Sequence, residues 1–116
     1  MDELRVLGIQ AHGFHGLFDH ERRDGQRFLV DIVAHVDLRT AGNSDAIDDT
    51  YDYAKMISRV KELIASGPYN LIERLAEVIA TTIKSEFALP TIEVTVHKPD
   101  APVAADVSDI SVTVRR

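Results

Sequence analysis

The sequence has no cysteine among its 116 residues, and it has no long apolar run. The lack of cysteine excludes disulfides, thiolate nucleophiles, cysteine-bound zinc and iron–sulfur clusters. No stretch reaches the ~18 consecutive apolar residues that a membrane-spanning helix needs. The first residues, Met1 to Arg5, also lack the basic and apolar regions of a signal peptide. We therefore expect a cytoplasmic protein that has no membrane partner.

Positive charge is also scarce. The chain carries 13 lysines and arginines against 19 aspartates and glutamates, which gives a net charge of −6. Nucleic-acid binding needs a basic stripe that displaces counterions, so we expect no nucleic-acid partner. The 45% apolar and 28% charged residues are typical of a folded globular protein. The length predicts a single domain over residues 1–116, and self-association would help so small a domain bury apolar surface.

Four segments have the alternating pattern of β-strands. The longest is 26–38, where every second residue is apolar, and 4–14 is a plausible partner for it. The apolar phase of 4–14 changes next to Gly8, which predicts a bulge there. Two shorter strands are predicted over 92–97 and 110–115. A long strand with one apolar face suits an antiparallel sheet that has one wet side.

Two amphipathic helices lie between the strand pairs. The first covers 53–64 and ends at Gly67-Pro68. The second opens at Asn70, predicted as its N-cap, with Glu73 three residues later in a capping box, and Pro90 stops it. The order ββααββ predicts an α+β fold, with a four-stranded antiparallel sheet and both helices on its apolar face.

Three histidines, His12, His15 and His20, cluster near the first turn. A zinc site needs three or four ligands that converge on one point, and residues three apart in an extended segment point to opposite faces. We therefore expect no metal site, and we interpret these histidines as turn and hydrogen-bonding residues. A serine–histidine–aspartate triad stays open on residue counts alone, although a Gly-x-Ser-x-Gly motif is absent.

Three charged residues each allow two interpretations. Glu21 lies in a highly charged connection, and the residues alone favour a solvated loop. Glu73 is favoured as a helix cap, although a carboxylate there could also accept two parallel N–H bonds from a pyrimidinone edge. Lys98 ends an apolar strand just before Pro99, so it could serve in acid–base chemistry or simply extend to water.

Six stretches in order along almost the whole chain carry a family resemblance. They are Ala11–Gly16, Glu21 with Gly25–Asp31, Asp37–Leu38, Asp49–Tyr53, Leu71–Ala76 and His97–Pro102. Together they resemble dihydroneopterin aldolase of folate biosynthesis. The resemblance implies the tunnelling fold, in which subunits join their sheets into a ring. It also implies a homo-octamer of two stacked tetramer rings, with sites at subunit boundaries.

The resemblance implies a retro-aldol reaction. 7,8-Dihydroneopterin would be cleaved to 6-hydroxymethyl-7,8-dihydropterin and glycolaldehyde, with 2′-epimerisation as a side activity. The N5=C6 imine of the substrate can accept the released electrons, so we expect neither a metal, a Schiff base nor another cofactor. Three alternatives stay open: a dihydroneopterin triphosphate 2′-epimerase, a non-catalytic pterin-binding ring protein, and a metal-dependent pterin synthase of the same fold.

The resemblance also assigns roles to residues that bind the substrate. Glu73 matches the anchor that bonds the 2-amino group and ring N3–H of the pterin. Ile72 matches a position that contributes backbone hydrogen bonds. Asp52 occupies a backbone-contact position where the family varies. Val103 stands where isoleucine is common, a near-isosteric change.

Three further residues match catalytic positions. Lys98 matches the proton donor and acceptor, which acts through an ordered water on the 2′-hydroxyl. Tyr53 matches a tyrosine that the neighbouring subunit supplies to cover the ring and to help protonate the enol-like intermediate. Glu21 matches the carboxylate near the side-chain hydroxyls. No functional residue of the family is missing from the sequence.

Overall fold

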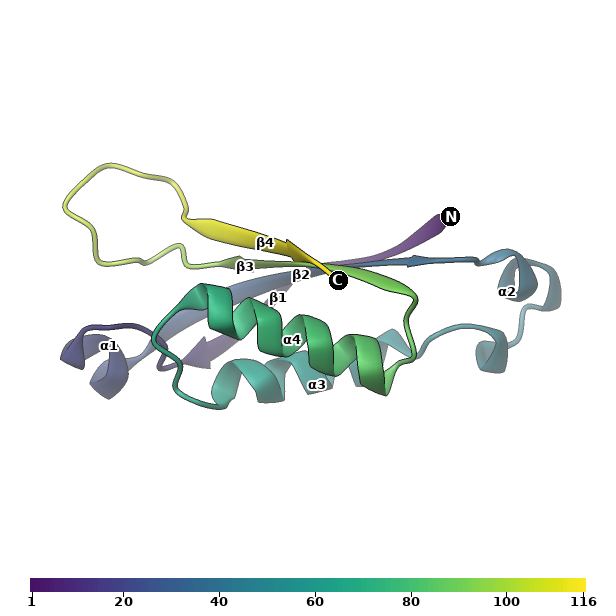
Figure 1. Cartoon of the computed structure of the whole chain (residues 1–116), viewed down its shortest axis with the longest axis horizontal. Helices are drawn as coiled ribbons and strands as arrows, with labels where there is room; N and C mark the ends of the chain where they lie inside the picture. Colours follow the sequence, from purple (N-terminus) through teal and green to yellow (C-terminus); the bar gives the residue numbers. More distant parts are fainter.

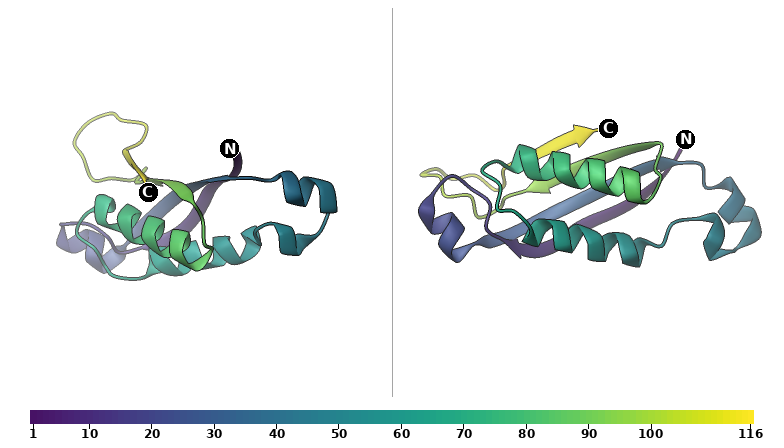
Figure 2. Two further views of the ribbon diagram at one scale, coloured as in Figure 1. Left: turned by 45° about the vertical axis from the view of Figure 1, so that its right-hand side comes forward. Right: turned by 60° about the horizontal axis from the view of Figure 1, so that its bottom comes forward.

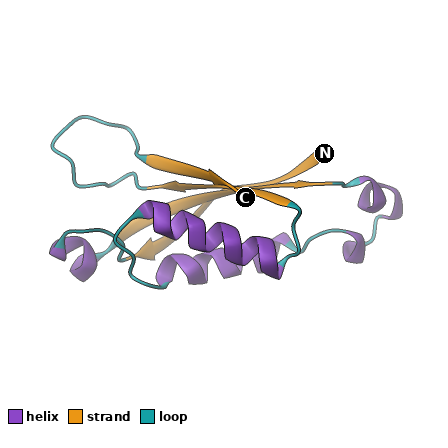
Figure 3. Cartoon of the chain, viewed as in Figure 1, coloured by secondary structure: helices purple, strands orange, loops and turns teal.

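The chain forms one antiparallel sheet with two long helices packed on one of its faces (Figures 1 and 3). The computed structural model describes residues 1–116. The four strands lie in the order β1-β2-β3-β4. Their bounds are β1 Asp2–Gly13, β2 Gln26–Val36, β3 Thr91–His97 and β4 Ser111–Arg115. The helices are α1 Asp19–Asp24, α2 Arg39–Ser44, the 3-10 turn η1 Ile47–Asp49, α3 Tyr53–Ala65 and α4 Ile72–Glu86.

The core lies between the sheet and helices α3 and α4. Helix α3 packs on β1, α4 packs on β3 and β4, and the two helices lie side by side (Figure 2). The alternation along β2 places one apolar row against the helices, and all of its members are almost or fully buried: Phe28, Val30, Ile32, Ala34 and Val36. Burying a large aliphatic or aromatic side chain contributes roughly 1.5–3 kcal/mol, so this row is a main source of stability. The predicted α+β fold is confirmed.

The predicted bulge in the first strand is present. The β1–β2 register shifts between Val6 and Ile9, and Gly8 between them has a φ of +72°. An added Cβ at Gly8 would meet no atom within 4 Å, so it is the backbone conformation that favours glycine there.

The start of α4 differs from the prediction. Its N-cap is Leu71 in an extended conformation, not Asn70, and no side chain caps the helix. The side-chain oxygen of Asn70 instead accepts from the Arg22 guanidinium. Glu73 therefore occupies the second helical position and forms no capping box. The predicted capping role of Glu73 is wrong, and its carboxylate remains free.

Short elements and strand ends account for the other differences. Strand β2 ends at Val36, two residues before the predicted end at Leu38. The charged connection contains the six-residue helix α1, while α2 and η1 occupy a segment for which no element was predicted. Helices this short show no hydropathy period. None of the helices has both the length and the apolar character needed to cross a bilayer.

Candidate active site

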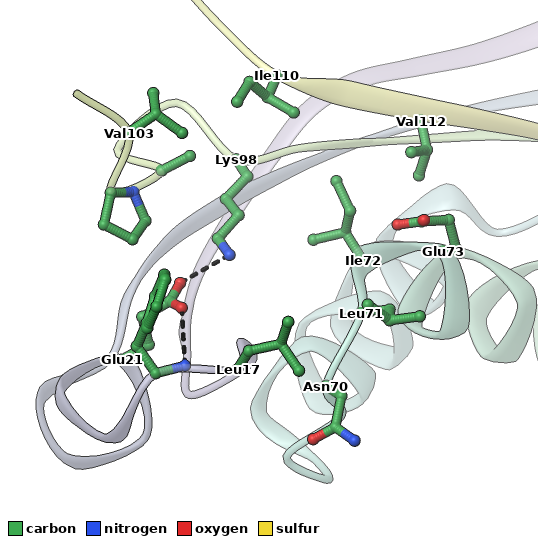
Figure 4. Close-up of a pocket in the computed structure, with 13 residues that line it drawn as sticks. Leu17, Glu21, Asn70, Leu71, Ile72, Glu73, Lys98, Val103, Ile110 and Val112 are labelled. Atoms are coloured by element: carbon green, nitrogen blue, oxygen red, sulfur yellow. Dashed lines mark hydrogen bonds and ion pairs between the residues drawn. The ribbon is translucent and has the colours of Figure 1, made fainter. Parts of the chain in front are cut away.

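A pocket of about 360 Å³ opens at the end of the sheet where β3 finishes. Three segments line it: the connection from β1 into α1, the first turn of α4, and the loop from β3 to the start of β4 (Figure 4). Its 13 lining residues are mostly apolar, and its charged members are Glu21, Glu73 and Lys98. Apolar walls with a few polar groups are typical of small-molecule sites.

A buried ion pair closes one side of the pocket. The Lys98 ammonium nitrogen lies 2.7 Å from Oε2 of Glu21, and the two side chains are only 14% and 3% exposed. Gln26 donates to the same oxygen at 2.8 Å, and the Phe18 amide donates to Oε1 at 3.3 Å. A Cβ at Gly16 would lie 2.4 Å from this carboxylate, so only glycine allows the close approach. The interpretation of Glu21 as a solvated loop residue is therefore wrong.

The surroundings of Glu21 keep it ionised. Burial alone would raise its pKa, but hydrogen bonds from Lys98, Gln26 and the Phe18 amide outweigh burial, so the pKa lies below its ordinary value. The pair is a lysine held in contact with a carboxylate, next to a mostly apolar cavity. A lysine placed in this way can donate a proton as the ammonium and accept one from a substrate hydroxyl as the neutral amine.

Glu73 and Ile72 form the opposite side of the pocket at the start of α4 (Figure 4). The Glu73 side chain is exposed and takes part in no hydrogen bond or ion pair. The Ile72 side chain is buried, and its backbone begins the helix, where amide groups have no intrahelical acceptor. This side therefore offers a free carboxylate beside unpaired backbone donors.

Tyr53 and Asp52 lie away from the pocket. Both are at the first turn of α3, near α2, whereas the pocket is at the other end of that helix (Figure 1). A helix of 13 residues is about 20 Å long, so one chain cannot bring these residues to its own Lys98. Tyr53 is 59% exposed, and Asp52 caps α3 by accepting from the amides of Ala54 and Lys55.

His15 links the end of α3 to the connection that leads into α4. Its Nε2 donates to the Ile64 carbonyl at 2.6 Å, and its Nδ1 accepts from the Tyr69 amide at 3.0 Å. Burial lowers its pKa, so the ring is the neutral form that this pairing needs. The interpretation as a hydrogen-bonding histidine is confirmed for His15. No group of three or more histidine and acidic side chains is arranged so that it could hold a metal ion.

Sequence reasoning did not identify several residues of the site. Gln26 holds Glu21, and apolar side chains from distant segments complete the walls, among them Leu17, Phe18 and Val112. Gln26 stood out only as part of a resembling stretch. The apolar residues had no signal in the sequence, because they lie in separate segments and come together only in the folded chain.

Comparison with known proteins identifies the family. The family model described as dihydroneopterin aldolase matches residues 4–115. The dihydroneopterin aldolase of Streptomyces coelicolor is 41% identical over 116 residues, covering 100% of this chain and 98% of that protein. The enzyme of Bacillus subtilis is 36% identical over 117 residues, with the same coverage.

A solved structure agrees with the sequence comparisons. E. coli dihydroneopterin aldolase, crystallised in complex with neopterin, superposes with a TM-score of 0.91 at 27% identity. The match covers 100% of this chain and 99% of that one. The chain belongs to the dihydroneopterin aldolase family, and it is an aldehyde-lyase of folate biosynthesis.

Proposed function

We propose that residues 1–116 form one dihydroneopterin aldolase-like domain that cleaves the C1′–C2′ bond of 7,8-dihydroneopterin. The products are 6-hydroxymethyl-7,8-dihydropterin and glycolaldehyde. The observation that carries this proposal is the Lys98–Glu21 pair at 2.7 Å, facing an apolar pocket whose other side holds an unpaired Glu73. The complex of the E. coli relative with neopterin supports a pterin as the ligand.

The Glu73 side of the pocket binds the pterin ring. Its carboxylate accepts two parallel bonds, from the 2-amino group and from ring N3–H. The backbone at Ile72 adds hydrogen bonds to the ring edge. The apolar Leu71 and Val112 beside it provide contact for the ring faces. This orientation directs the three-carbon side chain of the substrate toward Lys98.

The Lys98 side moves protons. In its neutral amine form Lys98, acting through an ordered water, takes the proton from the 2′-hydroxyl, and C2′ becomes the aldehyde carbon as the C1′–C2′ bond breaks. The released electron pair forms a C1′=C6 double bond, while the N5=C6 π electrons move to N5. Protonation at C1′, assisted by Tyr53, then restores the imine. Glu21 holds Lys98 in place and lies near the side-chain hydroxyls. Because the substrate accepts the electrons itself, the step needs no cofactor.

The position of Tyr53 and Asp52 implies a site shared between subunits. Both lie about one helix length from Lys98 within a chain, so a second copy must supply them. A shared site requires an oligomer, and we propose that it is the homo-octamer of two stacked tetramer rings that the family resemblance implies. We expect Lys98→Ala and Tyr53→Phe to be poorly active alone and to recover about a quarter of the wild-type rate when their subunits exchange at random. No recovery after subunit exchange would contradict a shared site.

Epimerisation at C2′ would follow from the same steps if glycolaldehyde rotates within the site and adds back through the opposite face of its carbonyl before it leaves. A triphosphate substrate is less favoured, because the nearby arginines are already engaged. Arg22 donates to the Gly16 carbonyl and to Asn70, Arg23 pairs with Asp24, and Arg27 pairs with Asp100.

The direct test is a metal-free incubation with 7,8-dihydroneopterin, with separation of the pterins and an assay for glycolaldehyde. Equal amounts of 6-hydroxymethyl-7,8-dihydropterin and glycolaldehyde would support the proposal. Inversion without cleavage would favour the 2′-epimerase, and binding without turnover would favour the non-catalytic ring protein. Activity that appears only when a divalent metal is added would favour the metal-dependent pterin synthase.

A further inference from the structure

A chain of hydrogen bonds runs across the face of the sheet opposite the helices. The Gly8 amide in β1 donates to Oδ1 of Asp31 in β2 at 2.7 Å. The other oxygen of Asp31 lies 2.7 Å from Nε2 of His97 in β3, and Nδ1 of His97 lies 2.6 Å from Asp109, just before β4. Successive strand residues point to opposite faces, so this chain lies directly behind Lys98.

The pairing fixes the charge of the His97 ring. An ionised carboxylate only accepts hydrogen bonds, so both ring nitrogens must carry a proton to satisfy Asp31 and Asp109. Burial alone would lower the pKa of His97, but these two carboxylates outweigh burial and raise it above its ordinary value. They are the charged groups that face the ring. Opposite His97 on β4 is the uncharged Ser111, and beyond Leu29 on β1 is the uncharged Gln10.

The bulge in β1 supplies the first donor of this chain. The register shift between Val6 and Ile9 takes Gly8 out of the regular ladder, and its amide bonds a side chain instead. Asp31 is thus held from two sides, by Gly8 and by His97. An acceptor fixed in this way fixes the ring that donates to it.

The His97–Asp109 bond joins the two ends of the loop 98–110, which forms one wall of the pocket. Residues 101–103 of that loop line the pocket. The loop has few other attachments: the Lys98 amide donates to the Ile110 carbonyl at 2.8 Å, and Asp100 forms a half-exposed pair with Arg27. The Lys98–Glu21 pair at 2.7 Å holds this loop from the pocket side, and the charge-assisted His97–Asp109 bond at 2.6 Å holds it from the other face of the sheet.

We propose that His97 is a positioning residue, whose bonds to Asp31 and Asp109 hold the end of β3 and the 98–110 loop so that Lys98 and the loop wall meet the substrate in one geometry. We call these three side chains the His97 clasp. The expected effect on turnover rests on the proposed function, whereas the effect on the loop does not.

The loop effect is measured by amide hydrogen exchange over residues 98–110. We expect exchange at least tenfold faster in His97→Gln, because glutamine carries both of its N–H donors on one nitrogen and cannot span the carboxylates that bind the two separate ring nitrogens. The matched control is His35→Gln, on the same face but at the other end of β2, where His35 is 3.8 Å from Glu3. The exchange rates of residues 98–110 in the control should stay within twofold of those in the wild type. Unchanged exchange in His97→Gln, in a protein that melts as the wild type does, would overturn the proposal.

The effect on turnover is measured by kcat and KM across pH, together with ring nitrogen NMR shifts of His97. Loss of a ring proton at high pH should break one bond of the clasp, loosen the loop wall and raise KM. Asp109→Asn removes one carboxylate, so the ring should lose its proton at lower pH, and the rise in KM should move to lower pH with it. A ring titration that moves while the KM profile stays fixed would overturn the positioning role. A wild type that does not cleave 7,8-dihydroneopterin would defeat the proposed function instead, and the exchange result would still decide the clasp.

Discussion

The two sides of the pocket each hold a glutamate in the first turn of a helix, yet the two glutamates differ in burial and in hydrogen bonding. Glu21 in α1 is buried, and both of its oxygens have partners. Glu73 in α4 is exposed and has none. The same residue type at similar local positions is prepared for two tasks: one carboxylate holds a lysine for proton transfer, and the other waits for a ligand. The difference comes from tertiary surroundings.

The largest effect that would test this comparison is the loss of Lys98. We expect Lys98→Ala to reduce turnover roughly 10²–10⁴-fold, the range for removing a positioned acid–base group. Pterin affinity should stay close to wild type, because the ring is bound on the other side. Single-turnover cleavage and a fluorescence titration measure the two quantities. Lys61→Ala, an exposed lysine on α3, is the control, and wild-type turnover in Lys98→Ala would refute the assignment.

Removing Glu73 should produce the converse result. Glu73→Ala should weaken pterin binding by roughly 1.5–3 kcal/mol, because a charge-assisted pair is lost. The melting temperature should hardly change, since Glu73 caps nothing. Glu73→Gln, which keeps the shape and removes the charge, is the matched comparison for the contribution of the charge. A dissociation constant that does not change would leave Glu73 without a role in binding.

His15 supports the Glu73 side by bonding Tyr69 in the connection that leads into α4, and its burial should appear as a pH dependence of stability. The pKa of His15 is lowered by burial from 6.5, so below pH 6.5 the unfolded chain takes up a proton that the folded chain refuses. The free energy of unfolding should therefore fall as pH drops from about 6.5, by up to 1.4 kcal/mol per pH unit. Urea titrations of wild type and His15→Gln measure it. The slope should be smaller in the variant, and equal slopes would count against this support.

The Glu21 side should respond at lower pH. The folded pKa of Glu21 lies below 4.5, so its contribution to stability is complete above pH 4.5 and is lost as pH falls through the folded value. Glu21→Gln should therefore flatten the unfolding profile below pH 4.5 and leave the slope near pH 6 unchanged. Urea titrations over pH 3–7 check this, and an altered slope near pH 6 alone would contradict it.

Much of the fold was predictable because it depends on local periodicity. The apolar alternation of 26–38 and the helical spacing of 53–64 identified β2 and α3, and the phase change identified the bulge at Gly8. The Asn70 cap failed because Arg22 occupies its oxygen, a contact between distant segments. Short helices such as α1 gave no period to detect.

The site was less predictable from the residues alone. From the residues alone, Glu21 was interpreted as a solvated loop residue, because its partner, Lys98, lies far along the chain. Glu73 read as a cap because the helix starts later than its N-cap motif suggests. The family resemblance selected the functional interpretation in both cases. His97 belonged to a resembling stretch, but its bonds to Asp31 and Asp109 could be found only in the structure.

The two sides of the pocket have separate tasks: the Glu73 side binds the pterin, and the Lys98 side transfers protons. The most direct measurement is a paired one: the single-turnover cleavage rate at saturating 7,8-dihydroneopterin and the dissociation constant for 6-hydroxymethyl-7,8-dihydropterin, for Lys98→Ala and Glu73→Ala. Lys98→Ala should lose the rate and keep the affinity, while Glu73→Ala should lose affinity and keep most of the rate. Equal losses of both quantities in both variants would contradict this separation of tasks.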